Sequence, residues 1–216
     1  MENINPKKSK TRGEIAKKII SWLVFTLALF AVVVVLLNIQ YFSLQFRLLV
    51  LGQMPKITMP QVQQSNSQVA IAEPNRLWIS SLGITAPIVY VTDATEKTFQ
   101  AALAGGVVHY PQTAEPGEFG NCYIFGHSSD YVWSHGAFKT VFALLTKIQP
   151  GAEILITNKQ GQLFTYKVTE AKVVGPNDTQ YLSQYGYGKK LLTLQTSYPI
   201  GTALKRYIVL AEMVEK

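Results

Sequence analysis

The chain has 216 residues, of which 48% are hydrophobic and 15% are charged, and its formal net charge is +7 at pH 7. This length suits one domain of ordinary size with additional segments. The first eighteen residues carry six basic and two acidic side chains, so they hold +4 of the total. The remaining +3 is spread over the rest of the chain without a basic stripe, which argues against nucleic acid as a partner.

The residues that usually bind metals are few and scattered. Cys122 is the only cysteine, which excludes an intramolecular disulfide and a cysteine-based metal site. The three histidines, His109, His127 and His135, do not follow a metal-binding spacing. We therefore expect neither a metal nor another cofactor.

A basic tail over residues 1–18 precedes an apolar segment that we assign to residues 19–40. From Ile19 to Leu37 no residue is charged, and only Ser21 and Thr26 are polar. About twenty apolar residues span the roughly 30 Å hydrocarbon core of a bilayer. A buried core helix is an alternative, but the segment is not amphipathic. A cleaved signal peptide is a stronger alternative, although no small-residue cleavage site follows Leu37. The pattern favours an uncleaved transmembrane helix.

The distribution of basic residues predicts the orientation of this helix. Six lysine and arginine residues precede it, whereas only Arg47 and Lys56 follow it closely. Positive charge is retained on the cytoplasmic side of membranes. We expect a single-pass protein of the cell membrane, with the lipid bilayer as a partner, a cytoplasmic N-terminus and an extracellular C-terminal domain.

Residues 41–75 are expected to connect the membrane to the folded domain. Residues 41–50 are rich in apolar side chains and could extend the helix or lie along the membrane surface. From residue 52 the segment is rich in Pro, Gln, Ser and Asn. Such a composition cannot bury a core, so it predicts a tether.

Residues 76–216 are expected to form one all-β domain with short helices. Runs of β-branched and aromatic residues bounded by turn residues predict eight strands, at 77–79, 84–91, 107–110, 121–125, 154–157, 163–174, 191–196 and 206–213. Residues 95–104 and 137–145 are expected to be short helices. Strands at this number and spacing are typical of a closed β-barrel.

The last two predicted strands place a hydroxyl group beside a cation. Pro199 and Gly201 lie between the strands, which therefore read as a hairpin. A closed hairpin brings Ser197 near Arg206. A hydroxyl nucleophile next to a fixed cation is half of an acyl-transfer site, because arginine can stabilise the charge that develops on a carbonyl oxygen. His127, after the strand at 121–125, is the candidate acid and base.

These motifs together resemble the sortases, membrane-anchored cysteine transpeptidases of the bacterial cell surface. The resemblance rests on a strand ending in Gly126-His127, the motif Thr193-Leu194-Gln195-Thr196-Ser197, and Arg206 on the next strand. It covers roughly residues 76 to 214. It implies a sortase-like eight-stranded β-barrel that cleaves a sorting-signal peptide of surface proteins through an acyl-enzyme and transfers it to an amine acceptor on the cell wall or a protein.

The resemblance also implies roles for individual residues. His127 would move protons, Arg206 would stabilise the oxyanion, and Thr196 would help to place the substrate carbonyl. Trp133, with Tyr131 in the loop after His127, could form a wall of the peptide groove or simply pack within the loop. His109 and His135 are expected to be structural or solvated.

Ser197 departs from the family, which has cysteine at this position. A thiol with a pKa near about 8.5 becomes a thiolate beside a cation, whereas a serine hydroxyl needs a base within reach. Three interpretations stay open: an engineered replacement, a natural relative that only binds peptide, and a working serine. Cys122 is expected to face the opposite side of its strand from His127, so it is not expected to replace Ser197 as the nucleophile.

The function expected from sequence is that of a sortase-like transpeptidase or hydrolase. The alternative is a catalytically inactive, membrane-tethered peptide-binding protein. A membrane-tethered structural protein is disfavoured, because packing alone does not require these motifs in this order.

Overall fold

The computed structural model describes residues 12–37, 39, 42–43, 46, 73–130, 134–184 and 188–215. The chain divides into two compact units, residues 1–39 and 40–216. The linker predicted over 41–75 lies outside the described residues, except for 42–43, 46 and 73–75. The proposed boundaries of tail, membrane segment, linker and domain therefore stay predictions.

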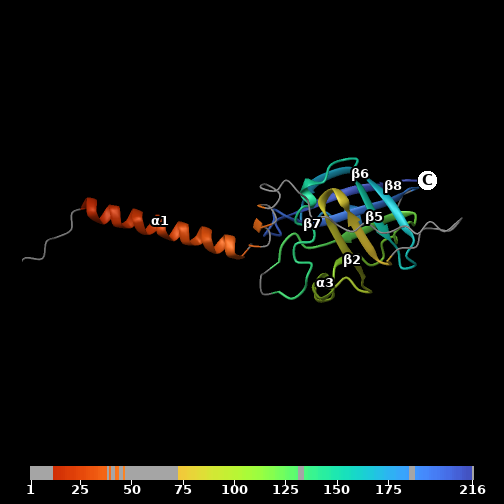
Figure 1. Cartoon of the computed structure of the whole chain (residues 1–216), viewed down its shortest axis with the longest axis horizontal. Coiled ribbons are helices and arrows are strands. Elements are labelled where there is room, and N and C mark those ends of the chain that lie inside the picture. The colour runs from red at the N-terminus through yellow and green to blue at the C-terminus, as the bar shows by residue number, and fades with distance from the viewer. Residues whose placement is uncertain are drawn as a thin grey trace, which may run out of the picture. The chain divides into compact units, whose positions relative to one another are not determined.

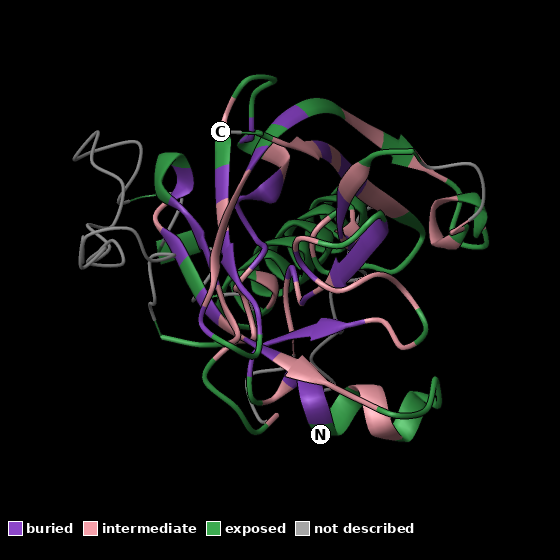
Figure 2. Cartoon of the chain, turned by 90° about the vertical axis from the view of Figure 1, so that its right-hand side faces the viewer, coloured by how far each residue is buried: buried purple, intermediate pink, exposed green. Residues whose placement is uncertain are grey.

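The described part of the first unit is the helix α1 (Arg12–Leu37) and residue 39. None of its residues belongs to the buried core, and its side chains are almost all exposed, as the green colour in Figure 2 shows. Its length and composition suit a membrane span and equally suit a signal sequence. The helix begins earlier than the segment predicted at 19–40, since the basic residues before Ile19 also favour a helix.

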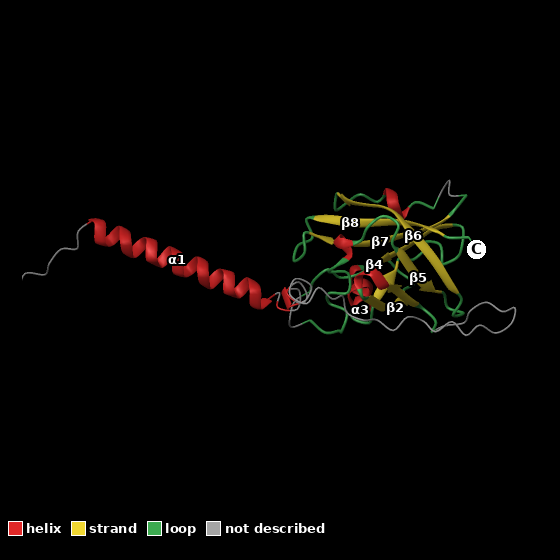
Figure 3. Cartoon of the chain, turned by 45° about the horizontal axis from the view of Figure 1, so that its top comes forward, coloured by secondary structure: helices red, strands yellow, loops and turns green. Residues whose placement is uncertain are grey.

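The second unit is a closed barrel of eight strands (Figures 1 and 3). The strands are β1 (Arg76–Ile79), β2 (Ile84–Tyr90), β3 (Val107–His109), β4 (Gly120–Phe125), β5 (Glu153–Thr157), β6 (Leu163–Val174), β7 (Lys190–Tyr198) and β8 (Lys205–Met213). Each predicted strand overlaps an observed one and differs from it by at most two residues at either end. The predicted all-β, eight-stranded barrel preceded by one apolar helix is confirmed.

The order of strands around the barrel is β1-β2-β3-β4-β7-β8-β6-β5. Strands β2 and β3 are parallel, as are β4 and β7, and the other neighbouring pairs are antiparallel. The pairing of β4 with β7 joins segments about seventy residues apart in sequence, for example Phe125 with Gln195. This pairing positions the candidate site.

The barrel interior is filled mainly by aliphatic side chains, together with the buried rings of Tyr166 and Phe142. Cys122, Ile124, Leu192 and Leu194 project into it from β4 and β7 and are at most 1% exposed. Figure 2 shows the buried residues, in purple, mainly in the strands. Each fully buried aliphatic side chain contributes about 1.5–3 kcal/mol through removal from water. Cys122 therefore faces the core, as predicted.

The helix α3 (Glu96–Leu103) covers part of the outside of the barrel. It begins after Thr95, whose hydroxyl accepts a hydrogen bond from the Thr98 amide. Its residues Ala102 and Leu103 form a second apolar cluster with Val108, and the helix contacts β2 and β3 (Figure 1). The helix predicted over residues 95–104 is confirmed over nearly the same residues.

The prediction of a helix over residues 137–145 is wrong. These residues form turns with hydrogen bonds between residues three apart, followed by the 3₁₀ helix η2 (Leu145–Lys147). The Phe142 amide donates to the carbonyl of His127 instead of to a helical partner. Phe142 is also fully buried in the barrel core. Tertiary packing therefore overrides the helical pattern.

Candidate active site

The register of two parallel strands brings His127 and Ser197 to the same edge of the barrel. Phe125, at the end of β4, pairs with Gln195 of β7. His127 and Ser197 each follow two residues later. Side chains alternate between faces along a strand, so residues two positions apart share a face. His127 therefore shares the outer face with Phe125, and Ser197 shares it with Gln195.

The hairpin of β7 and β8 adds the cation. Ser197 pairs directly with Arg206 in the antiparallel register, so the hairpin brings the two residues together as predicted. One guanidinium nitrogen of Arg206 donates to the carbonyls of Ala203, at 2.9 Å, and Lys205, at 3.1 Å. These bonds fix the arginine head on the hairpin turn and leave other guanidinium N–H groups available.

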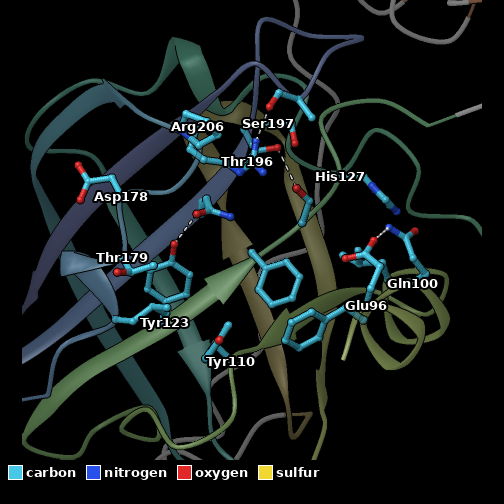
Figure 4. Close-up of a pocket in the computed structure, with 18 residues that line it drawn as sticks. Glu96, Gln100, Tyr110, Tyr123, His127, Asp178, Thr179, Thr196, Ser197 and Arg206 are labelled. Carbon is cyan, nitrogen blue, oxygen red and sulfur yellow. Dashed lines mark hydrogen bonds between the residues drawn. The ribbon is translucent and has the colours of Figure 1, made fainter. Parts of the chain in front are cut away.

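Ser197, His127 and Arg206 all line one cavity of about 380 Å³. This volume lies within the range of about 300–1,000 Å³ that is usual for ligand pockets. Figure 4 shows Ser197 and Arg206 close together, and His127 beside Glu96 and Gln100 of α3. A hydroxyl group, an imidazole and a guanidinium thus face a common space.

Three backbone contacts hold His127 in place. The Gly126 amide donates to the Gln195 carbonyl at 3.1 Å, and the His127 carbonyl accepts from Phe142 at 2.9 Å. A Cβ atom at Gly126 would lie 2.9 Å from the Phe142 ring, so this position requires glycine. The Thr196 hydroxyl donates to the Gly126 carbonyl at 2.8 Å.

The predicted role of Thr196 in substrate binding stays a prediction. Its side chain is buried, at 1% exposure, and its hydroxyl proton is already used by Gly126. Thr196 also borders the cavity. Its observed contact supports the backbone that carries His127. The other predicted substrate-binding residue, Trp133, and its neighbour Tyr131 lie outside the described residues.

Burial and nearby carboxylates act in opposite directions on His127. Burial lowers its pKa below the usual value, while the negative charges of Asp130 and then Glu96 raise it, and burial prevails. Nε2 of His127 lies 3.8 Å from Oδ2 of Asp130, which is an ion-pair distance but not a hydrogen bond. At neutral pH the imidazole is therefore mainly neutral and can accept a proton.

Ser197 is half-buried, and its hydroxyl makes no hydrogen bond to any residue that the structure describes. Ser197 and His127, both of which the structure describes, therefore share no preformed hydrogen bond. Catalytic hydrogen bonds often close only when substrate is bound. The substrate-free site is therefore compatible with two interpretations: His127 activates Ser197 when substrate binds, or Ser197 is not activated at all.

The floor and walls of the cavity are formed by residues that the motifs alone did not single out. Tyr123, two residues before Phe125, donates its hydroxyl to Gln195 Oε1 at 2.5 Å. Burial raises the Tyr123 pKa, and the charge of Arg206 opposes that rise, so the guanidinium lies near this floor. Tyr123 and Gln195 could have been identified from the sequence by the alternation of side chains. Tyr123 lies four residues before His127 and Gln195 lies two residues before Ser197, so each shares a strand face with its partner.

One wall comes from the connection between β6 and β7, which contributes Asp178, Thr179 and Leu182. Gln184 ties this connection to β4. Its side-chain oxygen accepts from the amides of Ala114 and Asn121, and its side-chain nitrogen donates to the carbonyls of Asn121 and Leu182. A side chain with four such bonds fixes the wall before any ligand binds.

The remaining histidines lie outside the cavity lining. His109 is 5% exposed, stacks on Tyr90 with ring centroids 4.9 Å apart, and contacts the Ala114 carbonyl at 2.9 Å. His135 is exposed. Burial raises the pKa of the Cys122 thiol, which disfavours the thiolate. Among the described residues, no three His, Cys, Asp or Glu side chains gather as a metal site.

Comparison with protein families identifies the class. The model of the sortase domain matches residues 77–214. This chain therefore belongs to the sortase family. A search of curated proteins gives no significant match.

Solved sortase structures resemble the chain in fold. Sortase D5 from Clostridium perfringens, described as a transpeptidase, is 29% identical, with a TM-score of 0.53 over 68% of this chain and 83% of that chain. Sortase A from Corynebacterium diphtheriae is 27% identical, with a TM-score of 0.54 over 70% of this chain and 64% of that chain. Sortase C-1 from Actinomyces oris supports the fold alone. It is 24% identical, with a TM-score of 0.55 over 76% of this chain and 88% of that chain. These matches support a sortase-type transpeptidase, a class that binds sorting-signal peptides and amine nucleophiles.

Proposed function

We propose that this chain is a membrane-anchored sortase that uses Ser197 as its nucleophile. It would cleave a sorting-signal peptide of a surface protein and transfer the acyl fragment to an amine of the cell wall or of another protein. The observation that carries the proposal is the convergence of His127, Ser197 and Arg206 on one cavity through the registers of β4, β7 and β8.

In the proposed reaction, His127 takes the hydroxyl proton while Ser197 Oγ attacks the scissile carbonyl carbon. The carbonyl electron pair moves to oxygen, where Arg206 stabilises the charge. The C–N bond then breaks, and the leaving amine receives the proton from His127. An acceptor amine attacks the resulting ester, gives its proton to His127, and expels Ser197, which recovers the proton. Water in place of the amine would give hydrolysis.

The cavity supports an extended peptide as the ligand. The aromatic rings of Phe99, Tyr110 and Phe125 line it together with the polar groups of Gln195 and Thr179. Apolar pockets with a few fixed polar groups bind side chains and orient a backbone. The wall fixed by Gln184 would lower the ordering cost of peptide binding.

A catalytically inactive peptide-binding protein is the second candidate function. The observation in its favour is the serine itself, which makes no hydrogen bond to His127 or to any other described residue. Such a protein would keep the cavity and bind a sorting signal without cleaving it.

The purified full chain should cleave a fluorescently labelled peptide from a library of sorting-type sequences. We expect a transfer product that appears only with an added amine, and an acyl adduct on Ser197 by mass spectrometry. The Ser197→Ala variant should bind peptide and give neither product. Binding without cleavage by either protein would contradict the enzyme and favour the second candidate.

The proposed topology is one membrane span at 19–40, with residues 1–18 in the cytoplasm and the domain at 76–216 outside on the linker 41–75. It is supported by the exposed apolar helix α1 and the basic residues before it. An impermeant protease added to intact cells should digest the domain and spare an N-terminal tag. Digestion of the tag instead would reverse the orientation, and release of a shortened domain into the medium would indicate a cleaved signal.

A further inference from the structure

The carboxylate of Asp130 faces the imidazole of His127 from the loop after β4. Asp130 Oδ2 lies 3.8 Å from His127 Nε2, and the two side chains are 19% and 17% exposed. We propose that Asp130 is a positioning residue for His127, which orients the imidazole and stabilises the imidazolium that forms when Ser197 gives up its proton. The inference rests on the proposed function, in which His127 is the acid and base.

The position of Asp130 is itself fixed. Its other carboxylate oxygen, Oδ1, accepts a hydrogen bond from the Ser134 hydroxyl at 3.0 Å. One oxygen is thus held by Ser134 while the second faces His127. A carboxylate held in this way needs little reorganisation when charge develops on the imidazole.

The charged groups around His127 come from several elements. Asp130 on the same loop as His127 and Glu96 on α3 act on its pKa, while Asp178 after β6 and Arg206 on β8 line the cavity that His127 borders. Of the two carboxylates that raise the His127 pKa, Asp130 has the larger effect. The Glu96 carboxylate also accepts a hydrogen bond from the Gln100 side chain. Asp130 is therefore the main group that opposes the effect of burial on the imidazolium.

A serine nucleophile needs this help more than a thiolate does. In the acylation step, a proton leaves Ser197 Oγ for His127 as the Oγ–C bond forms, so an imidazolium appears inside a partly buried site. The nearby carboxylate stabilises that cation without taking its proton. A thiol gives its proton to His127 before the attack, so the imidazolium that later protonates the leaving amine is already present in the resting state, and Asp130 then stabilises the resting state and the transition state alike. The effect of Asp130 should therefore depend on the nucleophile.

The first test measures His127 directly and does not require activity. The full chain, labelled at histidine and held in detergent, is titrated by NMR, with the three histidines assigned by substitution. Asp130→Asn should lower the His127 pKa, because it removes the larger of the two opposing charges. Glu96→Gln should lower it less, and Asp178→Asn should leave it unchanged. An unchanged His109 titration would show that each variant keeps its fold.

The second test compares Asp130→Asn in the serine protein and in the Ser197→Cys variant. Where such a carboxylate is hydrogen-bonded to histidine, its loss lowers kcat by about 10⁴-fold. The longer contact here predicts a loss on the order of 10²-fold in the serine protein. In the Ser197→Cys background we expect a loss of less than about tenfold, because a thiolate needs no base. The acid limb of the serine pH profile should move to lower pH with Asp130→Asn.

The outcomes separate this inference from the proposed function. The same His127 pKa in Asp130→Asn and in the parent protein would overturn the inference whether or not peptide is cleaved. Equal losses in the serine and Ser197→Cys backgrounds would also overturn it, since a merely structural residue would affect both alike. If no form cleaves any peptide, the proposed function fails while the titration still decides the role of Asp130.

Discussion

Replacing Arg206 by alanine should lower kcat/KM for peptide cleavage by about 10²–10³-fold. Loss of one preorganised oxyanion donor costs roughly 2.7–4 kcal/mol in transition-state stabilisation. Arg206 lies directly opposite Ser197 and is held by the carbonyls of Ala203 and Lys205, so its orientation is set before substrate arrives. The loss should appear mainly in kcat, because the charge on the carbonyl oxygen develops only in the transition state.

The neighbouring lysine provides a matched control. Lys205 is exposed and, by strand alternation, points away from the face that carries Arg206. Lys205→Ala removes the same charge from the same strand and should leave kcat/KM within about twofold, as is usual for a surface change. Arg206→Lys should recover only part of the activity, because an ammonium lacks the planar fork. Equal losses in Lys205→Ala and Arg206→Ala would contradict a specific role for Arg206.

The Ser197→Cys variant should cleave a sorting peptide about 10²-fold faster than the serine protein, or faster still. A thiol next to the Arg206 guanidinium ionises near neutral pH, whereas serine depends on His127 as a base. Base catalysis is worth about 10²–10⁴-fold, and the serine loses part of this gain because its hydroxyl makes no hydrogen bond to His127 within the described residues, whereas the thiolate does not need a base. Initial rates with one labelled peptide, measured side by side with and without an amine, give the comparison.

A thiol reagent offers an independent readout of the same site. Cys122 is 1% exposed, and burial raises its pKa, so it should not react. The reagent should therefore modify only position 197 in the Ser197→Cys variant, and adding Arg206→Ala should move the pH dependence of that reaction upward. If the serine protein is as fast as Ser197→Cys, the site is built for a hydroxyl and the predicted advantage of the thiolate is wrong.

Local patterns in the sequence determined the strands and the hairpin of this protein. Alternating β-branched and aromatic residues between turn residues gave all eight strands, since strand side chains alternate with a period of two. The β7–β8 hairpin could also be predicted, because two strands joined by a short connection with Pro199 and Gly201 are expected to pair antiparallel. Its register put Ser197 opposite Arg206. The face of Cys122 followed from the same alternation.

The tertiary structure decided how distant segments meet. The parallel pairing of β4 with β7 sets His127 beside the Ser197 strand, and no local pattern encodes a pairing across about seventy residues. The turns at 137–145 replaced a predicted helix because Phe142 is buried in the core and its amide bonds to His127. The position of Asp130 beside His127 likewise depends on how the loop after β4 folds back. Periodicity fixes the type of an element, whereas register and loop geometry depend on packing between elements that are far apart in sequence.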